Sequence, residues 1–289
     1  MNNLLQISQV IANVGILTFV VASMAALGLS LSVSQILQPL RNGRLVAMAL
    51  LANFVLTPAL ALAIKAVIPM DEGYATGLIL LATAAGAPFL PKLVQVAKSA
   101  VALSVGVMVL LMVATIIYVP LVLPLLLPGV AVNPLDIAWS LVVLMLFPLA
   151  IGLLIKSRYG TVADSLQPLL AQISNMGLML GFVALLALSW RSLLSTMGSG
   201  AILATALLIA GAFLIGWLLA GKERTVRPVL GLGTAQRNIS AALVVAGGNF
   251  DDPKVLVMCM VGALLMLVSL MITAGEMGKR VSADDEQKK

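Results

Sequence analysis

The chain has no histidine and a single cysteine, Cys259, among its 289 residues. The lack of histidine excludes the commonest general acid–base chemistry and most transition-metal sites. One cysteine cannot form an intramolecular disulfide, so cysteine usage gives no information about the redox compartment. Charged residues are also scarce: they make up 10% of the chain, whereas an ordinary soluble domain contains about 25%.

Apolar sequence takes the place of the missing charge. Hydrophobic residues make up 61% of the chain, and the mean hydropathy is +1.13. A water-soluble protein of this composition would have too little polar surface to cover its core. The net charge of +6 is spread singly and in pairs between apolar runs, which argues against a nucleic-acid partner. The sequence therefore predicts an all-α polytopic protein embedded in a lipid bilayer.

Nine runs are long enough to cross a bilayer, which takes about 20 apolar residues. They cover residues 10–33, 45–68, 74–96, 101–127, 137–155, 166–189, 201–220, 226–248 and 255–274. The connections between them are too short to hold a soluble domain. We therefore expect one membrane-spanning domain over residues 1–275, followed by a polar cytoplasmic tail at 276–289.

The basic residues between the runs predict the orientation. Of the 17 lysines and arginines, 12 lie in one alternate set of connections together with the tail, and three lie in the opposite set. The positive-inside rule places the richer set in the cytoplasm. We expect an integral plasma (inner) membrane protein with its amino terminus outside and its carboxyl terminus in the cytoplasm.

The two remaining basic residues, Lys92 and Arg237, lie inside the third and eighth runs. Both runs contain residues that interrupt helices, because proline lacks a backbone donor and glycine is a weak helix former. We predict breaks near 86–91 and 231–235. The residues expected to form them are Gly86, Pro88, Pro91, Gly231 and Gly233.

The two interrupted runs have opposite directions and lie five spans apart. This pattern is typical of transporters built from inverted repeats, with a substrate site near the middle of the membrane. Nine spans would make a four-plus-five arrangement. Two structural alternatives remain: Lys92 could extend to the interface, and Arg237 could only cap carbonyls freed by the helix break. An arginine at this depth is nevertheless a functional hypothesis by default.

Local strings along the chain resemble the bile acid:sodium symporter superfamily. Residues 26–31 (ALGLSL) resemble its "MGLTL", residues 51–58 (LANFVLTP) its "AQFxxMP", and residues 236–238 (QRN) its "E-x-x-x-Q-N". Residues 97–105 resemble the entry to the helix after the first crossover. The resemblance implies a core of spans 2–4 and 7–9 with two crossing broken helices, and a panel of spans 1, 5 and 6. It also implies transport of organic anions, usually driven by two sodium ions.

The sodium ligands of that family are mostly missing here. The aligned positions without a side-chain oxygen are Leu90, Pro91, Met108, Gly233 and Arg237, and only Ser104 and Asn53 keep one. Arg237 is then a permanent substitute for sodium or an anchor for an anion. Lys92 is a candidate for proton coupling, because a desolvated lysine can lose its proton near neutral pH.

The resulting hypothesis is a secondary transporter of a small or amphipathic organic anion. It would work by alternating access without sodium, with Arg237 and Lys92 in place of bound cations. The candidate binding residues are Arg237, Lys92, Asn238, Gln236, Asn53, Ser104 and Thr234. We expect no cofactor and no bound metal, and the oligomeric state stays open.

An anion channel and a non-transporting sensor on the same fold are the alternatives to a carrier. An intramembrane enzyme is not expected. The spans contain no histidine and no central aspartate, and a Ser–Lys dyad would have only Lys92 as its base.

Overall fold

The computed structural model describes residues 2–32, 34, 35, 37, 41–127 and 133–286, and every regular element within these ranges is helical. Seven stretches are long and apolar enough to cross a membrane: Asn13–Ser30, Gly43–Val67, Val101–Leu126, Pro134–Arg158, Ala201–Leu219, Val226–Asn249 and Pro253–Ser282. The chain is therefore an all-helical membrane protein.

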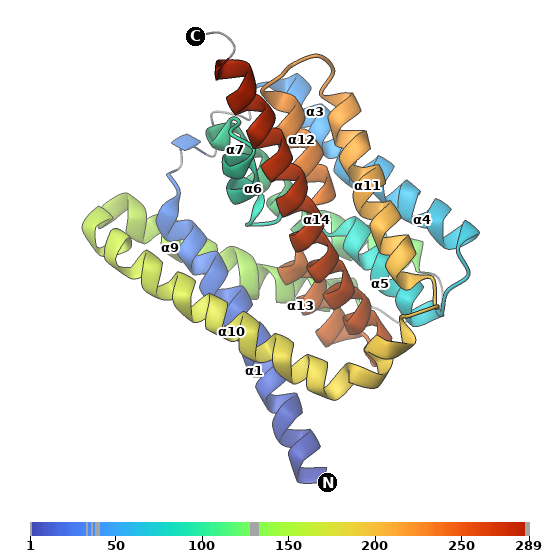
Figure 1. Cartoon of the computed structure of the whole chain (residues 1–289). Helices are drawn as coiled ribbons and strands as arrows, with labels where there is room; N and C mark the ends of the chain where they lie inside the picture. Colours follow the sequence, from blue (N-terminus) through green and yellow to red (C-terminus); the bar gives the residue numbers. More distant parts are fainter. Residues whose placement is uncertain (1, 33, 36, 38–40, 128–132, 287–289) are drawn as a thin grey trace.

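The helices are labelled as in Figure 1. The first half contains α1 (Asn2–Ser30), α3 (Gly43–Leu51), α4 (Thr57–Val67), α5 (Glu72–Thr83), α6 (Leu90–Val96) and α7 (Val101–Leu126). The second half contains α8 (Pro134–Leu141), α9 (Phe147–Arg158), α10 (Gly160–Ser195), α11 (Ala201–Leu219), α12 (Val226–Ala235), α13 (Ile239–Asn249) and α14 (Pro253–Glu286).

Two spans contain a wide π turn. Ala52–Leu56 joins α3 to α4, and Val142–Leu146 joins α8 to α9. Each turn is followed by a proline, Pro58 or Pro148, at the second position of the next helix. Proline lacks an N–H and its ring clashes with the carbonyl four residues earlier, so a wider turn before each proline gives that carbonyl room.

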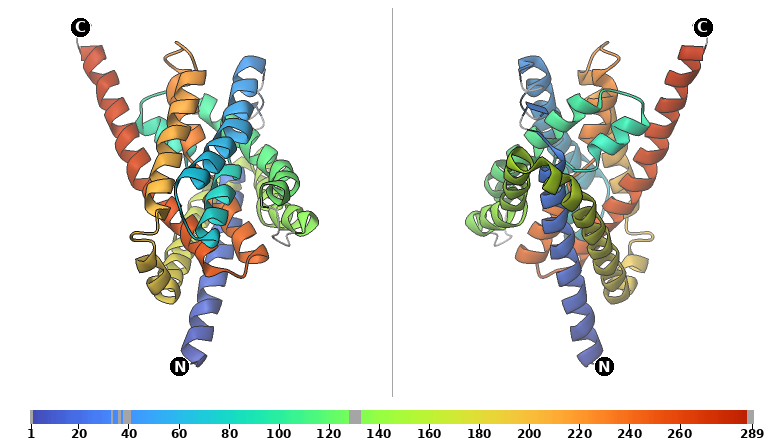
Figure 2. Two further views of the ribbon diagram at one scale, coloured as in Figure 1. Left: turned by 90° about the vertical axis from the view of Figure 1, so that its right-hand side faces the viewer. Right: turned by 90° about the vertical axis from the view of Figure 1, so that its left-hand side faces the viewer.

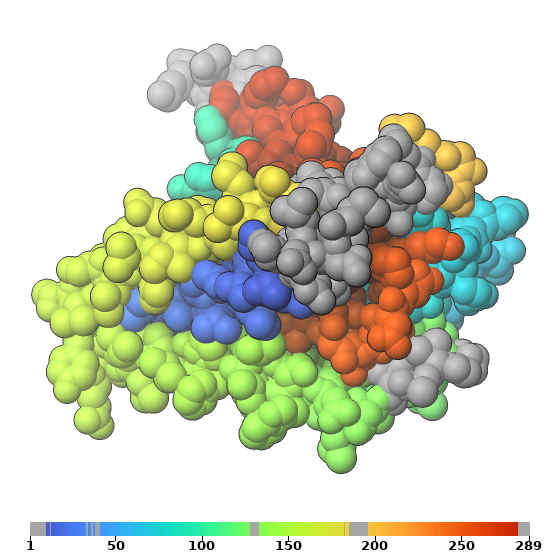
Figure 3. All heavy atoms as spheres, turned by 90° about the horizontal axis from the view of Figure 1, so that it is seen from below, coloured from blue at the N-terminus to red at the C-terminus, as the bar shows by residue number. Residues whose placement is uncertain are grey.

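Helices α1, α9 and α10 pack against one another on one side of the molecule (Figure 1). Glycines allow their backbones to touch: a Cβ on Gly15 would overlap the backbone of Gly181, and one on Gly28 would overlap that of Leu149. The amino-terminal end of α1 and the carboxyl-terminal end of α14 project from the bundle at opposite ends (Figure 2). Seen from below, α1 lies beside α10 and close to α13 (Figure 3).

The third run is broken, as the sequence predicts. Helix α5 ends at Thr83 and α6 begins at Leu90. Gly86 has a φ of +79° and lies so close to the backbone of Met112 that a Cβ would collide with it. Pro88 lies between the helices, while Pro91 falls in the first turn of α6, where a missing N–H costs nothing.

The eighth run is broken too, but the predicted position was wrong. Gly231 and Gly233 lie inside α12, and the break covers residues 236–238. The two glycines serve packing: a Cβ at Gly231 would contact the ring of Phe213, and one at Gly233 would contact Leu90. They bring α12 close to its neighbours and leave its hydrogen bonds intact.

Helix α14 runs through Glu286, although the sequence predicts the last span to end at residue 274. Gly278 packs against the carbonyl of Val96, and Ser282 accepts a hydrogen bond from Lys98 at 2.5 Å. The first part of the segment that the sequence predicts as a polar tail is thus helical, and it contacts the chain at the end of α6.

Candidate functional site

The guanidinium of Arg237 lies at the crossing of the two broken spans and is 1% exposed. Its Nε donates to the carbonyl of Leu81 at 3.0 Å, and Nη2 donates to that of Ala82 at 2.8 Å. Nη1 donates to the carbonyl of Thr234 at 2.8 Å and to Oδ1 of Asn53 at 2.7 Å. All four acceptors are neutral, so Arg237 forms no salt bridge with the described residues.

Helix dipoles provide the compensation that a carboxylate would otherwise give. Leu81 and Ala82 belong to the last turn of α5, and Thr234 belongs to the last turn of α12. The carboxyl-terminal end of a helix carries roughly half a negative charge. Two such ends directed at one guanidinium stabilise its charge locally, although a helix as a whole carries no net charge.

The π turn of the second span presents Asn53 to Arg237. Asn53 lies within this turn, and its Nδ2 donates to the carbonyl of Ala49 and to Oγ1 of Thr234. Downstream, Tyr118 of α7 donates its hydroxyl proton to the carbonyl of Phe54 at 2.6 Å. Tyr118 thus satisfies a carbonyl in the widened turn and holds the segment that carries Asn53.

Asn238 links the two breaks. Its backbone N–H donates to the carbonyl of Ala84 at 2.9 Å, and its Nδ2 donates to that of Gly86 at 3.0 Å. Its Oδ1 accepts from the N–H of Ala241 and so caps α13. One side chain therefore starts a helix and replaces a hydrogen bond that the first break has lost.

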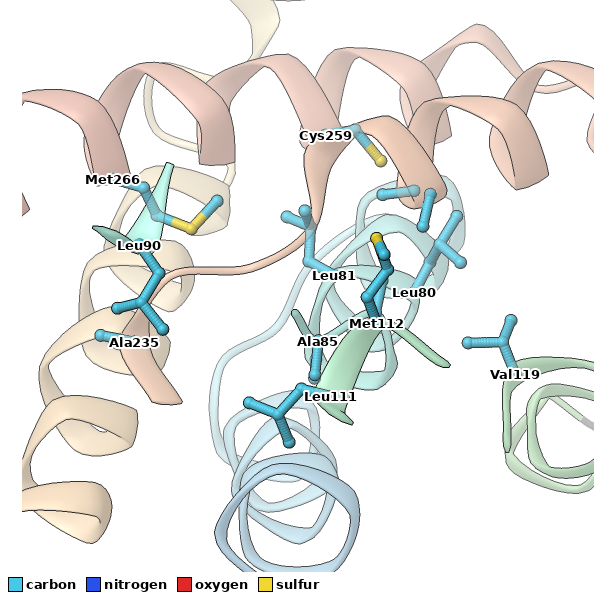
Figure 4. Packing of buried hydrophobic residues seen from close by; sticks show 14 of the residues in the cluster. Leu80, Leu81, Ala85, Leu90, Leu111, Met112, Val119, Ala235, Cys259 and Met266 are labelled. Carbon is cyan, nitrogen blue, oxygen red and sulfur yellow. The ribbon is translucent and has the colours of Figure 1, made fainter. Parts of the chain in front are cut away.

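Helix α7 supports the first break from the other side. Thr115 Oγ1 accepts from the N–H of Ala85 at 2.9 Å and donates to the carbonyl of the same residue at 3.0 Å. Figure 4 shows Leu81 and Ala85 packed with Leu111 and Met112 at this contact. Nothing in the sequence around Thr115 or Tyr118 distinguished them as partners of the breaks.

A cavity of about 680 Å³ adjoins the crossing. Three groups of residues line it: α1 between Phe19 and Ser30, α10 between Gln167 and Met179, and the crossing itself with α14 behind it. The size is that of a site for a small organic ligand, for which about 300–1,000 Å³ is usual. The α14 wall is apolar, formed by Met260, Ala263, Leu264 and Leu267.

The end of the cavity at Arg237 is polar and incompletely satisfied. Gln236 Oε1 and Ser240 Oγ are buried and have no hydrogen-bond partner within the described structure. The N–H groups of Ile239 and Ser240 open α13, where a helix cannot bond them internally, and no described carbonyl accepts them. These groups surround the positive end of a helix dipole, which attracts anions. Sequence reasoning missed Ser240, although its place just after an asparagine cap was a usable signal.

Lys92 and Ser104 are not brought into this cluster. Lys92 is exposed on α6, and its Nζ donates to Oε1 of Gln95 at 3.3 Å. Ser104 is buried, and its hydroxyl donates to the carbonyl of Val101 within α7. The other candidates, Arg237, Asn238, Gln236, Asn53 and Thr234, all lie at the crossing.

The residues at the crossing do not suit a sodium ion. Sodium, like other hard cations, prefers several oxygen ligands, and Asn53 Oδ1 and the carbonyl of Thr234 already accept from Arg237. Within the described ranges, no three acidic, cysteine or histidine side chains gather in a potential metal site. The guanidinium thus already binds oxygen atoms of the crossing that could otherwise contact a cation.

The family of this chain follows from a comparison with a sequence profile. The profile of the sodium bile acid symporter family matches residues 17–196. The chain belongs to the sodium bile acid symporter family. The profile match ends before the second break, which carries Arg237.

Two curated relatives from Arabidopsis thaliana agree with the family. One is named probable sodium/metabolite cotransporter BASS6, chloroplastic, and is 24% identical over 267 residues, which are 85% of this chain and 65% of the relative. The other, probable sodium/metabolite cotransporter BASS3, chloroplastic, is 25% identical over 195 residues, 67% of this chain and 45% of the relative. The matched region thus spans just under two thirds of the first relative and less than half of the second.

Proposed function

We propose that this protein is a secondary transporter of a small or amphipathic organic anion, and that it works by alternating access without sodium. The observation that carries the proposal is the environment of Arg237. A permanently charged group, hydrogen-bonded only to neutral acceptors, adjoins a mostly apolar cavity with unpartnered polar atoms at its near end.

The sodium part of the proposal rests on the charge and contacts of Arg237. The guanidinium holds the carbonyls at the ends of α5 and α12, which are the groups most attractive to a cation. A sodium ion about 5 Å away would be repelled by roughly 3 kcal/mol at an effective dielectric constant near 20. Every acidic side chain from Asp71 to Glu276 is exposed, so no buried carboxylate in this range offsets that repulsion.

The anion part rests on the polar end of the cavity. The start of α13, with the N–H groups of Ile239 and Ser240, provides donors for a carboxylate or sulfonate. Arg237 contributes a positive potential, and one of its five N–H groups has no acceptor among the described residues. The apolar wall of α14 suits a hydrocarbon body attached to the anionic group.

The transmembrane arrangement belongs to the same proposal. Nine spans result when α5 with α6 counts as one broken span, α12 with α13 as the other, and α10 as an unbroken span. The two broken spans are then equivalent elements of inverted repeats, with α1, α9 and α10 as a separate panel. The basic connections place the carboxyl terminus in the cytoplasm and the amino terminus outside.

The test compares binding and uptake with and without sodium. Purified full-length protein is screened by thermal shift against four monoanions: taurocholate, oestrone sulfate, pantoate and 4-methyl-2-oxopentanoate. We expect at least one to raise the melting temperature equally in sodium and in choline buffer, and its uptake into proteoliposomes to proceed in choline. An uptake that collapses in choline and recovers in millimolar sodium would disprove the sodium part. The absence of any shift with all four anions would disprove the anion part.

Arg237→Gln is the matched variant for this test. It restores the amide typical of the family without restoring the family's glutamate. We expect it to lose anion binding while it remains folded in detergent, as judged by gel filtration. Unchanged binding and uptake by the folded variant would mean that Arg237 does not serve the site.

A further inference from the structure

Arg237 differs from a bound cation in one respect that affects the transport cycle: it cannot leave. Its side chain is 1% exposed and is the only ionised one among the buried residues of the described ranges. The helix ends around it contribute dipoles but no net charge. Without a ligand, the site therefore keeps a net charge of +1 at every stage of the cycle.

A bound anion changes this net charge by its own valence. A monoanion brings the site to zero, whereas a dianion leaves it at −1 and a neutral ligand leaves it at +1. A net charge is costly to transfer through a low-dielectric region. Reorientation is therefore easiest for the site that holds one monoanion, and harder for the site without ligand.

From this charge balance we infer that the protein is a monoanion exchanger: a monoanion must occupy the site for rapid reorientation in either direction. The inference rests on the proposed function and adds its mode of transport and the valence of its substrate. A sodium symporter can return without its ions and so remove their charge. In this chain the positive charge is covalently attached, and only a counter-substrate can neutralise it for the return step.

The membrane potential acts on the same charge. Moving one elementary charge through 100 mV changes an equilibrium by up to about 50-fold, whether the group moves or the field around it is redistributed. A cytoplasm at negative potential therefore favours the unliganded site on the cytoplasmic side. In the structure, the cavity extends from Arg237 to Ser30 and Gln167, at the ends of α1 and α10 that the basic connections assign to the cytoplasm.

The experiment measures exchange against net uptake in sodium-free proteoliposomes. The probe is the radiolabelled form of whichever of the four monoanions gives the largest melting shift. One set of vesicles is preloaded with the same unlabelled monoanion, a second with the dianion 2-oxoglutarate, and a third with buffer. We expect initial uptake to be at least tenfold faster into the first set than into the other two. A valinomycin-induced potential, negative inside, should slow uptake into the third set and leave exchange in the first set unchanged.

Equal initial rates into all three sets would overturn the exchange inference, and so would binding without uptake into any of them. Either result leaves the anion site of the proposed function standing, whereas a failure of all four monoanions to bind overturns both.

Two variants sharpen the outcome. Arg237→Lys keeps the charge and should keep the stimulation by preloaded monoanion. Arg237→Met removes the charge together with the proposed anion anchor, so both uptake rates should fall to those of protein-free vesicles. A loss of the stimulation in folded Arg237→Lys would contradict the assignment to charge.

Discussion

The two helix breaks that meet at Arg237 are constructed differently. The first, residues 84–89, is a backbone break, with Gly86 at φ +79° and Pro88 between the helices. The second, residues 236–238, has the sequence Gln-Arg-Asn, with neither glycine nor proline. Its residues bond across to the first broken span: Arg237 donates to carbonyls in the last turn of α5, and Asn238 donates to carbonyls within the first break.

This difference divides the roles between the two halves of the site. The first break exposes carbonyls and has no charged side chain directed at them, so it acts as the acceptor surface. The second provides the guanidinium, which satisfies carbonyls at the end of α5, and the amide, which satisfies a carbonyl within the first break. Each break depends on the other for its hydrogen bonds, but only the first is imposed by its own backbone. Substitutions should therefore act through backbone strain in the first break and through lost partners in the second.

The largest expected effect is that of Gly86→Ala. An alanine at φ +79° costs about 1–2 kcal/mol, and its Cβ would collide with the backbone of Met112, which adds about 1–3 kcal/mol. We expect the free energy of unfolding to fall by about 2–5 kcal/mol. The single cysteine, Cys259, is buried, so thermal unfolding can be followed by its reaction with a thiol-specific fluorophore.

Gly247→Ala is the matched control for Gly86→Ala. Gly247 lies in α13 with no atom near its missing Cβ, so the variant should be neutral or slightly stabilising. Equal stability of Gly86→Ala and Gly247→Ala would show that the first break tolerates a side chain and is not imposed by its backbone.

Arg237→Met comes second in expected size. It leaves three carbonyls and the oxygen of Asn53 without their donor, and each unpaired buried acceptor costs about 1–3 kcal/mol. Removal of the desolvated charge offsets part of this loss. We expect a net decrease of about 2–4 kcal/mol in the same thermal assay, because several acceptors are affected at once.

Lys92→Met is the paired measurement for Arg237→Met. It removes the other basic residue that the sequence places inside a span, but Lys92 is exposed and bonded only to Gln95 among the described residues. Stability should change within about 0.5 kcal/mol. A loss with Lys92→Met as large as that with Arg237→Met would show that burial does not separate the two cations.

How far the sequence predicts this site depends on which groups enforce each feature. Gly86 and Pro88 act through the backbone alone, and the position of the first break could therefore be predicted. Gly231 and Gly233 resemble the same signal but serve helix packing, a distinction that depends on neighbours such as Phe213.

The sequence does not predict in which direction the side chains point. Lys92 is exposed on α6, and no helical periodicity carries across the irregular segment 84–89 that precedes this helix. The family resemblance, by contrast, correctly identified the family, since it depended on the order of strings over nearly the whole chain.

Asn238→Ala should lower the free energy of unfolding less than Gly86→Ala or Arg237→Met does. The backbone hydrogen bond to Ala84 remains, while the cap on Ala241 and the bond to the carbonyl of Gly86 are lost. Loss of a cap costs about 0.5–2 kcal/mol and a hydrogen bond about 1 kcal/mol. We expect a decrease of about 1–3 kcal/mol. Asn238→Asp keeps the cap and loses only the donor, so a decrease as large as that of the alanine variant would contradict the capping role.

The smallest effect should come from the opposite end of α5, where Asp71 pairs with Lys254 of α14 at 2.5 Å. Both ends of α5 are thus tied to the second half by a charged group, one exposed and one buried. Asp71→Asn keeps the side-chain size and the cap on Gly73 but removes the ion pair. Exposed ion pairs contribute little to stability. The melting temperature at pH 7 should therefore fall less than in Gly86→Ala, Arg237→Met and Asn238→Ala.

The effect of Asp71→Asn should also depend on pH. The hydrogen bond from Lys254, together with that from the N–H of Gly73, lowers the pKa of the Asp71 carboxyl. A carboxyl with a lowered pKa in the folded state stabilises above its unfolded value, about 3.9, and the contribution disappears as the pH falls through the folded value. The wild-type and Asp71→Asn melting curves should therefore differ at pH 7 and approach each other below about pH 4.

Glu72→Gln is the control for Asp71→Asn. It breaks the exposed pair with Lys65 within the hairpin of α4 and α5, and it should leave the difference between wild type and Asp71→Asn unchanged. A gap between wild type and Asp71→Asn that widens on acidification would mean that the charge of Asp71 opposes the contact between α5 and α14.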